Sequence, residues 1–232
     1  MFTLIHNTVS RYTLNLKGIP FKTEWVEFLD IEPLCKKLSI SPTSKKADGS
    51  DYYTLPAIHD PSTGVYISDS IFIAEYLEKT YPDTPQVFPH HTLTLQAAFT
   101  AAFVNNLSAL WNFIVPTAFE KLSPRSQEYF HHTREKSLRK TLEDLAPKGE
   151  AAVAEWAQFR DGLGKANAWY VKNGGQGPYL LGETQSWGDI IVASYLKWMR
   201  AVWGDDSQQW KDISFWNNGQ WAAISEGLKK YE

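Results

Sequence analysis

The sequence predicts two domains, an α/β domain over about the first 80 residues and an all-helical domain after it. Short strand-like and helix-like segments alternate up to residue 82, whereas the apolar spacing from Thr92 onward is helical throughout. Between these parts, Pro82 and Pro85 block helix continuation and stiffen a linker. We therefore expect domains at residues 1–82 and 93–232, joined by a linker at 83–92.

The elements of the first domain follow from hydrophobic alternation and turn chemistry. A helix is expected to stop at Gly18, a residue suited to the left-handed position after a helix, and residues 60–64, Asp-Pro-Ser-Thr-Gly, favour a hairpin. The predicted order is strand 2–5, helix 8–16, strand 21–28, helix 31–38, loop 39–51, strands 53–59 and 65–67, and a helix from residue 70.

Four helices are expected in the second domain, at 93–119, 125–145, 151–170 and 190–202. Pro116 should kink or end the first of them, because proline lacks the N–H that a helix interior requires. Ser186-Trp187-Gly188-Asp189 has the S-x-x-D spacing of a capping box, which predicts a helix start rather than a catalytic site.

Composition narrows the classes of function. The net charge is −3 and the lysines and arginines are dispersed, so no surface attracts a nucleic-acid backbone. No apolar run approaches the roughly 18 residues of a membrane-spanning helix, and the N-terminus does not resemble a secretory signal. Cys35 is the only cysteine, which excludes an internal disulfide and fits the cytoplasm. The 10 Trp, 11 Tyr and 12 Phe indicate either an aromatic core or a cavity for flat apolar ligands.

Two short motifs in the first domain suggest a site for an amino-acid-like ligand. If the Leu55-Pro56 bond were cis, the backbone of Leu55 would face outward and could pair with an extended peptide. Asp69 and Ser70 lie at a predicted helix start, where unpaired N–H groups favour an anion. Ser70 can bind a carboxylate and Asp69 an ammonium group. Each motif also has a purely structural interpretation, a strand start and an N-cap pair respectively.

The order of elements, with Leu55-Pro56, a hairpin and Asp69-Ser70, resembles the N-terminal domain of glutathione transferases, and the helices that follow resemble their second domain. Residues 11–27 and 30–38 are similar to the fungal FuA class of basidiomycetes, which is related to bacterial ether-cleaving transferases. The resemblance implies a thioredoxin-like domain that binds glutathione as co-substrate and an all-helical domain that lines a pocket for a hydrophobic or aromatic partner molecule. It also implies a two-fold homodimer.

The same resemblance implies a catalytic serine, followed by Pro and Asn, between the first strand and the first helix, where its hydroxyl would stabilise the glutathione thiolate. Counting back from Arg11 places Leu4 or a neighbour at this position, and neither Leu4 nor Ile5 can donate a hydrogen bond. We hypothesise that Asn7 or Thr8 partly replaces the serine. Alternatively, the thiol is activated poorly, or the true strand lies upstream of a misassigned start.

Other candidates have more ordinary interpretations. We expect Cys35 to be buried and to serve packing only. We expect no metal site at His90-His91 or His131-His132, because adjacent histidines do not share a helical face. Trp111 and Phe113 are the candidates for the hydrophobic pocket. The expected function is transfer of glutathione to hydrophobic or aromatic electrophiles or aryl ethers. The alternative is a ligandin that binds plant polyphenols or terpenoids with little turnover.

Overall fold

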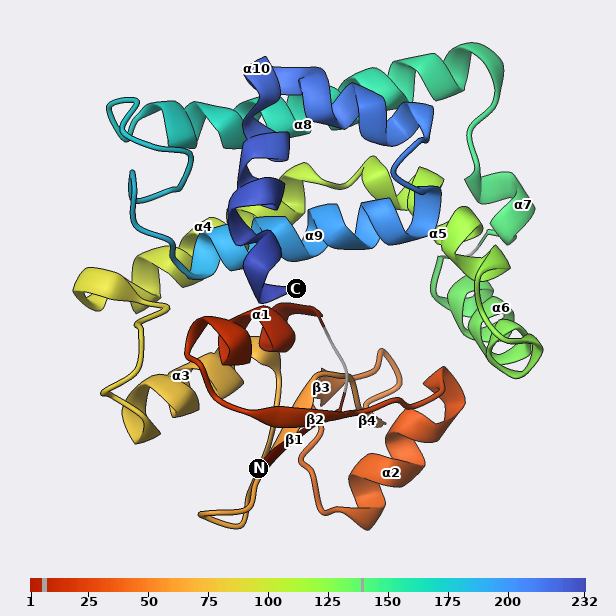
Figure 1. The fold of residues 1–232 in the computed structure, drawn as a ribbon. Coiled ribbons are helices and arrows are strands. Elements are labelled where there is room, and N and C mark those ends of the chain that lie inside the picture. Colours follow the sequence, from red (N-terminus) through yellow and green to blue (C-terminus); the bar gives the residue numbers. More distant parts are fainter. Residues whose placement is uncertain (6–7, 139) are drawn as a thin grey trace. The chain divides into compact units, whose positions relative to one another are not determined.

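The computed structural model describes residues 1–5, 8–138 and 140–232, and the chain forms two compact units (Figure 1). Unit 1 comprises Met1–His91 together with Leu228–Glu232, and unit 2 comprises Thr92–Gly227. The expected second domain therefore ends five residues earlier than predicted, since the C-terminal residues pack with unit 1. Two hydrogen bonds hold them there, from Tyr12 Oη to Glu232 Oε1 (3.2 Å) and from Asn15 Nδ2 to the Tyr231 carbonyl (2.9 Å).

Unit 1 is built on a four-stranded mixed sheet of order β2-β1-β5-β6. Strand β1 pairs parallel with β2 and antiparallel with β5, which pairs antiparallel with β6. The elements are β1 (Phe2–Ile5), α1 (Thr8–Leu16), β2 (Phe21–Glu24), η1 (Phe28–Asp30), α2 (Ile31–Lys37), β3 (Ser44–Lys45), β4 (Asp51–Tyr52), β5 (Ala57–Asp60), β6 (Val65–Ser68), α3 (Ser70–Thr80) and η2 (Pro89–His91).

Alternating side chains of the central strands separate two apolar clusters, as the period of a strand requires. Leu4 and Ile58 belong to the cluster that includes residues of α1 and α3, whereas Ile5 and Ala57 belong to the cluster that includes Cys35 of α2. Cys35 is 1% exposed, and burial raises the pKa of its thiol. The predicted packing role of Cys35 is confirmed.

The predicted elements of unit 1 are present with shorter bounds. Strand β2 ends at Glu24 instead of residue 28, and β5 begins only at Ala57, four residues later than predicted. The polar stretch 39–51, expected to be a loop, contains β3, which pairs with β4 in a small hairpin. The ends of these strands depend on their pairing partners and not on residue type, because a strand extends only as far as its backbone groups form hydrogen bonds with a neighbouring strand.

Two buried polar groups fix the helices of unit 1 against the sheet. Asp60, 1% exposed, accepts hydrogen bonds from Tyr76 and Tyr81 (both 2.6 Å) and two from Ser62. Burial opposes its ionisation, but these four hydrogen bonds hold the pKa of Asp60 well below its usual range. Lys17, at the end of α1, pairs with Glu78 of α3 at 2.7 Å.

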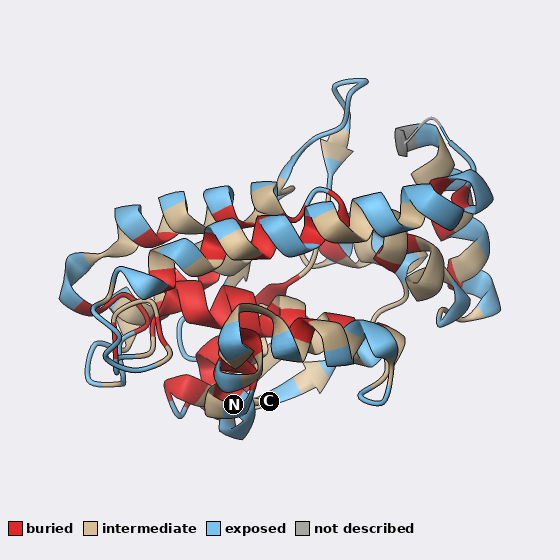
Figure 2. Ribbon diagram, turned by 90° about the horizontal axis from the view of Figure 1, so that it is seen from above, coloured by how far each residue is buried: buried red, intermediate tan, exposed pale blue. Residues whose placement is uncertain are grey.

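Unit 2 is helical. Figure 2 shows buried residues along the inner faces of its helices and exposed residues on the outer faces. The longest buried stretch is in α9, which has eleven buried residues. The helices are α4 (Leu93–Asn106), α5 (Leu110–Glu120), α6 (Pro124–Leu138), α7 (Leu142–Leu145), α8 (Gly149–Val171), α9 (Trp187–Trp203) and α10 (Gln208–Leu228), followed by η3 (Lys229–Tyr231) in the C-terminal segment.

The expected helix over residues 93–119 is two helices, and the break does not fall at Pro116. Helix α4 ends at Asn106, α5 begins at Leu110, and their axes differ by 81°. Pro116 lies inside α5, which accommodates it. The bend lets both helices pack on α9, which buries more apolar surface than one straight rod would.

Helix α8 packs against the end of α4 at Gly162, where a Cβ atom would collide with the main-chain oxygen of Asn106. Several rings of unit 2 form an aromatic cluster. Trp156 alone contacts the rings of Phe113, Phe159, Trp203 and Trp216 at centroid distances of 5.1–5.8 Å. Within the described residues, no single helix meets the length and hydropathy of a membrane span, although the bent pair α4 and α5 meets them jointly.

The predicted capping box at the start of α9 is present. Asp189 is completely buried and accepts hydrogen bonds from the Ser186 N–H (2.9 Å), the Ser186 hydroxyl (2.8 Å) and the Leu180 N–H (2.8 Å). Burial outweighs these hydrogen bonds and raises the pKa of Asp189 to about 6. Asp189 therefore joins the loop before α9 to the helix itself.

Candidate functional site

Three segments of unit 1 meet at one edge of its sheet. Ile5, the last residue of β1, pairs with Ala57, the first residue of β5, and Ala57 pairs with Ser68, the last residue of β6. The end of β1, the Leu55-Pro56 step and the start of α3 consequently lie side by side. The two motifs that the sequence analysis singled out, Leu55-Pro56 and Asp69-Ser70, therefore lie at the same edge of the sheet.

The Leu55-Pro56 bond is cis, which is the condition that the sequence analysis set for an outward-facing Leu55 backbone. Pro56 is buried and Leu55 is half-buried. Within the part of the chain that the structure describes, the backbone N–H and C=O of Leu55 form no hydrogen bond with other residues. Leu55 therefore presents a donor and an acceptor that an extended peptide can use.

Asp69 joins this backbone edge to α3. Its N–H donates to the Pro56 carbonyl at 3.1 Å, and its side-chain Oδ1 caps α3 by accepting from the Ile71 N–H at 3.2 Å. Its backbone has φ 75° and ψ 129°, a conformation that an L-residue rarely adopts and that costs about 1–3 kcal/mol. Residues held in such conformations cluster at ligand sites.

Ser70, the first residue of α3, is half-buried. Its hydroxyl and N–H lie at the positive end of the helix dipole, which favours a carboxylate. The structure therefore brings Leu55, Pro56, Asp69 and Ser70 together.

The two candidates for thiol activation lie at the start of α1. Asn7 falls outside the described residues. Thr8 is the first residue of α1 and is half-buried. Leu4 is fully buried in β1, paired with Thr23 and Ile58, so the suggestion that Leu4 occupies the serine position is wrong.

The remaining polar residue of this segment within the described residues is Ser10. Its side chain is fully buried in α1, and its hydroxyl has no hydrogen-bond partner among the described residues. Of the two hydroxyl residues Thr8 and Ser10, only Thr8 is partly exposed.

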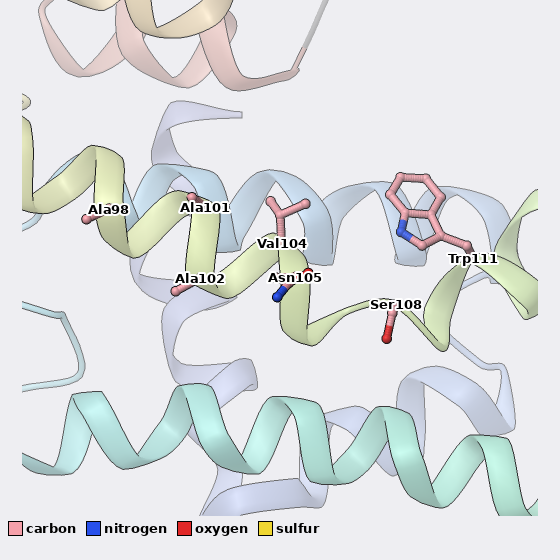
Figure 3. Close-up of a pocket in the computed structure, with 7 residues that line it drawn as sticks. All are labelled: Ala98, Ala101, Ala102, Val104, Asn105, Ser108 and Trp111. Atoms are coloured by element: carbon pink, nitrogen blue, oxygen red, sulfur yellow. The ribbon is translucent and has the colours of Figure 1, made fainter. Parts of the chain in front are cut away.

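The two predicted pocket residues differ in environment. Trp111 is 37% exposed and lies 5.6 Å from Trp198 between ring centroids, whereas Phe113 is half-buried and packs edge-on against Trp156. Trp111 borders an open hollow of about 850 Å³, and Phe113 is not among the residues that line it. Figure 3 shows the lining residues of α4, of the connection after it and of α5: Ala98, Ala101, Ala102, Val104, Asn105, Ser108 and Trp111.

Sequence reasoning missed the polar side of this hollow. Asn105 and Ser108 line it beside small apolar residues. They fall at the helix break, and a continuous helix over 93–119 gave no reason to place them at a surface. The small side chains of α4 at positions 98, 101 and 102 were the available signal, since a row of alanines leaves open space beside a helix.

A four-stranded mixed sheet flanked by three helices, followed by a helical unit, is the glutathione transferase fold. The family model of the glutathione S-transferase N-terminal domain matches residues 9–80, and that of the C-terminal domain matches residues 94–231. The chain belongs to the glutathione S-transferase family.

Solved structures and a curated relative give the same result. A glutathione S-transferase of Ceriporiopsis subvermispora, crystallised in complex with glutathione, is 43% identical, with a TM-score of 0.93 over 100% of this chain and 97% of that one. GSTFuA3 of Phanerochaete chrysosporium is 36% identical, with the same TM-score and coverage. The glutathione S-transferase-like protein ustS of Aspergillus flavus is 32% identical over 225 residues, 92% of this chain and 79% of that protein.

These similarities confirm the predicted family, the fold and the likeness to fungal FuA-class transferases. The relation to bacterial ether-cleaving transferases stays a prediction.

Proposed function

We propose that this chain binds glutathione at the sheet edge of unit 1 and transfers it to hydrophobic or aromatic electrophiles. The observation that carries the proposal is the hydrogen bond from the Asp69 N–H to the Pro56 carbonyl, which holds an unpaired backbone edge beside a helix N-terminus. A transferase 43% identical to this chain was crystallised with glutathione, which supports the same ligand here.

Each part of glutathione has a chemically suitable partner at this edge. The backbone of Leu55 would pair with the cysteinyl residue in the manner of an added strand. Ser70 and the first N–H groups of α3 would bind the γ-glutamyl carboxylate. Because Asp69 Oδ1 already caps α3, Oδ2 is the oxygen available to the ammonium group.

The expected reaction is attack of the glutathione thiolate on an electrophilic carbon. A halide or an aryloxide departs in a substitution, whereas addition to an isothiocyanate has no leaving group and its nitrogen takes up a proton. Ile5, the last residue of β1, pairs with Ala57 and so lies beside the Leu55-Pro56 step. We propose that Thr8, the first residue of α1, or Asn7 donates to the sulfur. A hydroxyl or amide at a helix start is a weaker and less precisely placed activator than a dedicated serine, so we expect slow turnover.

Calorimetric titration with glutathione tests the binding step. Ser70→Ala should weaken binding at least about fivefold, because it removes one hydrogen bond to a charged group. Ser214→Ala is the matched control, since Ser214 lies in unit 2 and donates only to the Lys211 carbonyl. Absence of any glutathione binding at millimolar concentration in the folded wild type would overturn the proposal.

The thiol pKa of bound glutathione tests the activation step. Thr8→Val should return it toward the value of free glutathione and reduce turnover of isothiocyanate and halonitrobenzene substrates. A bound thiol already as weakly acidic as free glutathione in the wild type would show that neither Thr8 nor Asn7 acts as proposed.

The second candidate function is a ligandin, a protein that binds plant polyphenols or terpenoids with little turnover. The hollow beside Trp111 favours it, because an aromatic face, small apolar side chains and two polar groups suit a hydroxylated aromatic molecule. Quercetin can serve as the probe. Saturable binding that Trp111→Ala abolishes, with no turnover of electrophiles, would favour the ligandin over the transferase.

We further propose a cytoplasmic homodimer. Light scattering coupled to size-exclusion chromatography measures the oligomeric state directly, and a mass near 26.4 kDa at micromolar concentration would exclude the dimer.

A further inference from the structure

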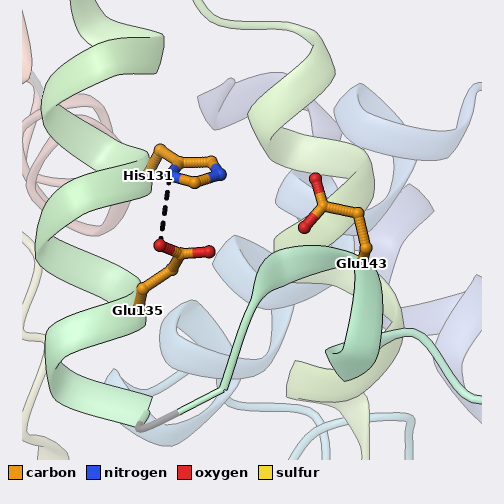
Figure 4. A group of neighbouring side chains, drawn as sticks. All are labelled: His131, Glu135 and Glu143. Carbon is orange, nitrogen blue, oxygen red and sulfur yellow. Dashed lines mark ion pairs between the residues drawn. The ribbon is translucent and has the colours of Figure 1, made fainter.

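A group of potential metal ligands lies in unit 2, on α6 and α7, and belongs to neither the sheet edge nor the hollow beside Trp111. It consists of His131, Glu135 and Glu143. Figure 4 shows their side chains converging from the two helices. We propose that these three residues bind a divalent transition-metal ion, and that Zn²⁺ is the ion they fit best.

The spacing of the ligand atoms supports this assignment. One ligand atom from each residue lies within 4.8 Å of the other two. His131 Nδ1 and Glu135 Oε2 are 3.3 Å apart, which is about the edge of a tetrahedron whose metal–ligand distance is about 2.0 Å. Only the Glu143 carboxylate has to move closer, and its side chain is exposed and rotatable.

The helical register explains why His131 takes part and its neighbour does not. His131 and Glu135 are four residues apart on α6 and so share one face, whereas His132 projects about 100° away and is exposed. The ring of His131 is further oriented by Phe119, at 5.8 Å between centroids. Thr141 caps α7 by accepting from the Asp144 N–H, which places Glu143 in the first turn of that helix.

The donor set selects among metals. One imidazole nitrogen and two carboxylate oxygens match the ligands of zinc, whereas calcium and magnesium prefer oxygen alone. Two carboxylates and a neutral imidazole together balance the charge of a divalent ion. Among the described residues, neither glutamate forms an ion pair with a lysine or arginine that the metal would have to displace.

A bound ion would join α6 to α7 and so stabilise this part of unit 2. An ion that binds only the folded state raises the free energy of unfolding by RT ln(1 + [L]/Kd), where [L] is the concentration of free ion. The sequence analysis dismissed the histidine pairs on spacing alone. The sequence analysis did not associate Glu143 with His131, because one continuous helix was expected over residues 125–145. In such a helix Glu143 would lie about 18 Å along the axis from His131.

Calorimetric titration of the chelator-treated full chain with ZnCl₂ at pH 7.5 tests the site. We expect one saturable site, at least about tenfold weaker in His131→Ala and in Glu143→Gln. His132→Ala and Glu128→Gln are the matched controls, because both residues are exposed on α6. Zinc should also raise the melting temperature of the wild type and of both controls.

Three results would overturn the proposal. The first is no saturable zinc binding by the wild type, and the second is equal loss in His132→Ala and His131→Ala. The third is unchanged affinity in Glu143→Gln, whose exposed and isosteric side chain should leave folding intact. Circular dichroism of each variant excludes loss of helix as the cause of weakened binding.

Discussion

Replacement of Asp189 by alanine provides a quantitative test of how unit 2 is held together. The change removes the acceptor of three hydrogen bonds at the start of α9 and leaves the N–H groups of Ser186 and Leu180 buried without a partner. Each such group costs about 1–3 kcal/mol. Relief of the buried charge offsets part of this cost, so we expect a net loss of about 3 kcal/mol at pH 7.5, or about 6–12 °C in melting temperature.

The pKa of Asp189 predicts how this loss depends on pH. Burial raises the pKa to about 6 in the folded chain, against 3.8 for an ordinary aspartate. The folded state therefore binds more protons between these values. The stabilisation from Asp189 is complete below about pH 4 and declines as the pH rises through 6. Linkage gives a decline of about 1.4 kcal/mol between pH 5 and pH 7.5, so the variant should lose more stability at pH 5.

Calorimetric unfolding of wild type and variant at the two pH values measures both effects. Asp161→Ala is the control, because Asp161 is an exposed aspartate of α8 and should change stability by less than about 0.5 kcal/mol. Glutathione affinity per folded molecule should be the same in both variants, since Asp189 lies in unit 2. An unchanged melting temperature, or a larger loss at pH 7.5 than at pH 5, would refute the reasoning.

Three further substitutions test other parts of the fold. Asp60→Asn should lower the free energy of unfolding by about 2–4 kcal/mol at pH 7. This loss should shrink as the pH falls below about 4, because the lowered pKa of Asp60 stabilises the folded state fully only above the pKa of the unfolded chain. Urea unfolding at pH 7 and at about pH 2.5 measures both effects. Lys17→Met should lower the free energy of unfolding by about 3 kcal/mol at pH 7, because it leaves the carboxylate of Glu78 without its partner. Adding Glu78→Gln should restore at least about 1 kcal/mol of this stability in a double-mutant cycle. Strictly additive effects of the two substitutions would contradict the buried pairing. Gly162→Ala should lower the melting temperature sharply, because the added Cβ atom would collide with the end of α4. Gly164→Ala is the control, since its Cβ atom would meet no atom closer than 3.8 Å. We expect this control to be neutral or to stabilise the fold by up to about 1 kcal/mol.

Local rules predicted most of unit 1. Turn chemistry located the hairpin between β5 and β6, and Gly18 adopts the left-handed conformation expected after α1, with φ 67°. The capping box at Ser186 was also predictable, because it depends on residues close in sequence. The burial of Cys35 was predictable from its residue type.

Features that depend on partners distant in sequence were not predictable. The break between α4 and α5 falls at residues without glycine or proline, while Pro116 is accommodated inside α5. At this break, Asn106 at the end of α4 packs closely against Gly162, which lies more than fifty residues later in the chain. The same limit explains Phe113, whose ring packs on Trp156, a residue more than forty positions later in the chain.

The proposed site separates into two parts that respond differently to sequence change. In the proposed binding mode, backbone groups of the Leu55 edge and of the first turn of α3 supply part of the recognition, and these groups do not depend on side-chain identity. The proposed activation of the thiol instead needs one side-chain donor at the start of α1, where a single replacement would remove it. Loss of that donor would therefore lower turnover without lowering affinity. A chain without the donor would still bind glutathione, so a transferase and a ligandin could differ by one donor while sharing the rest of the fold.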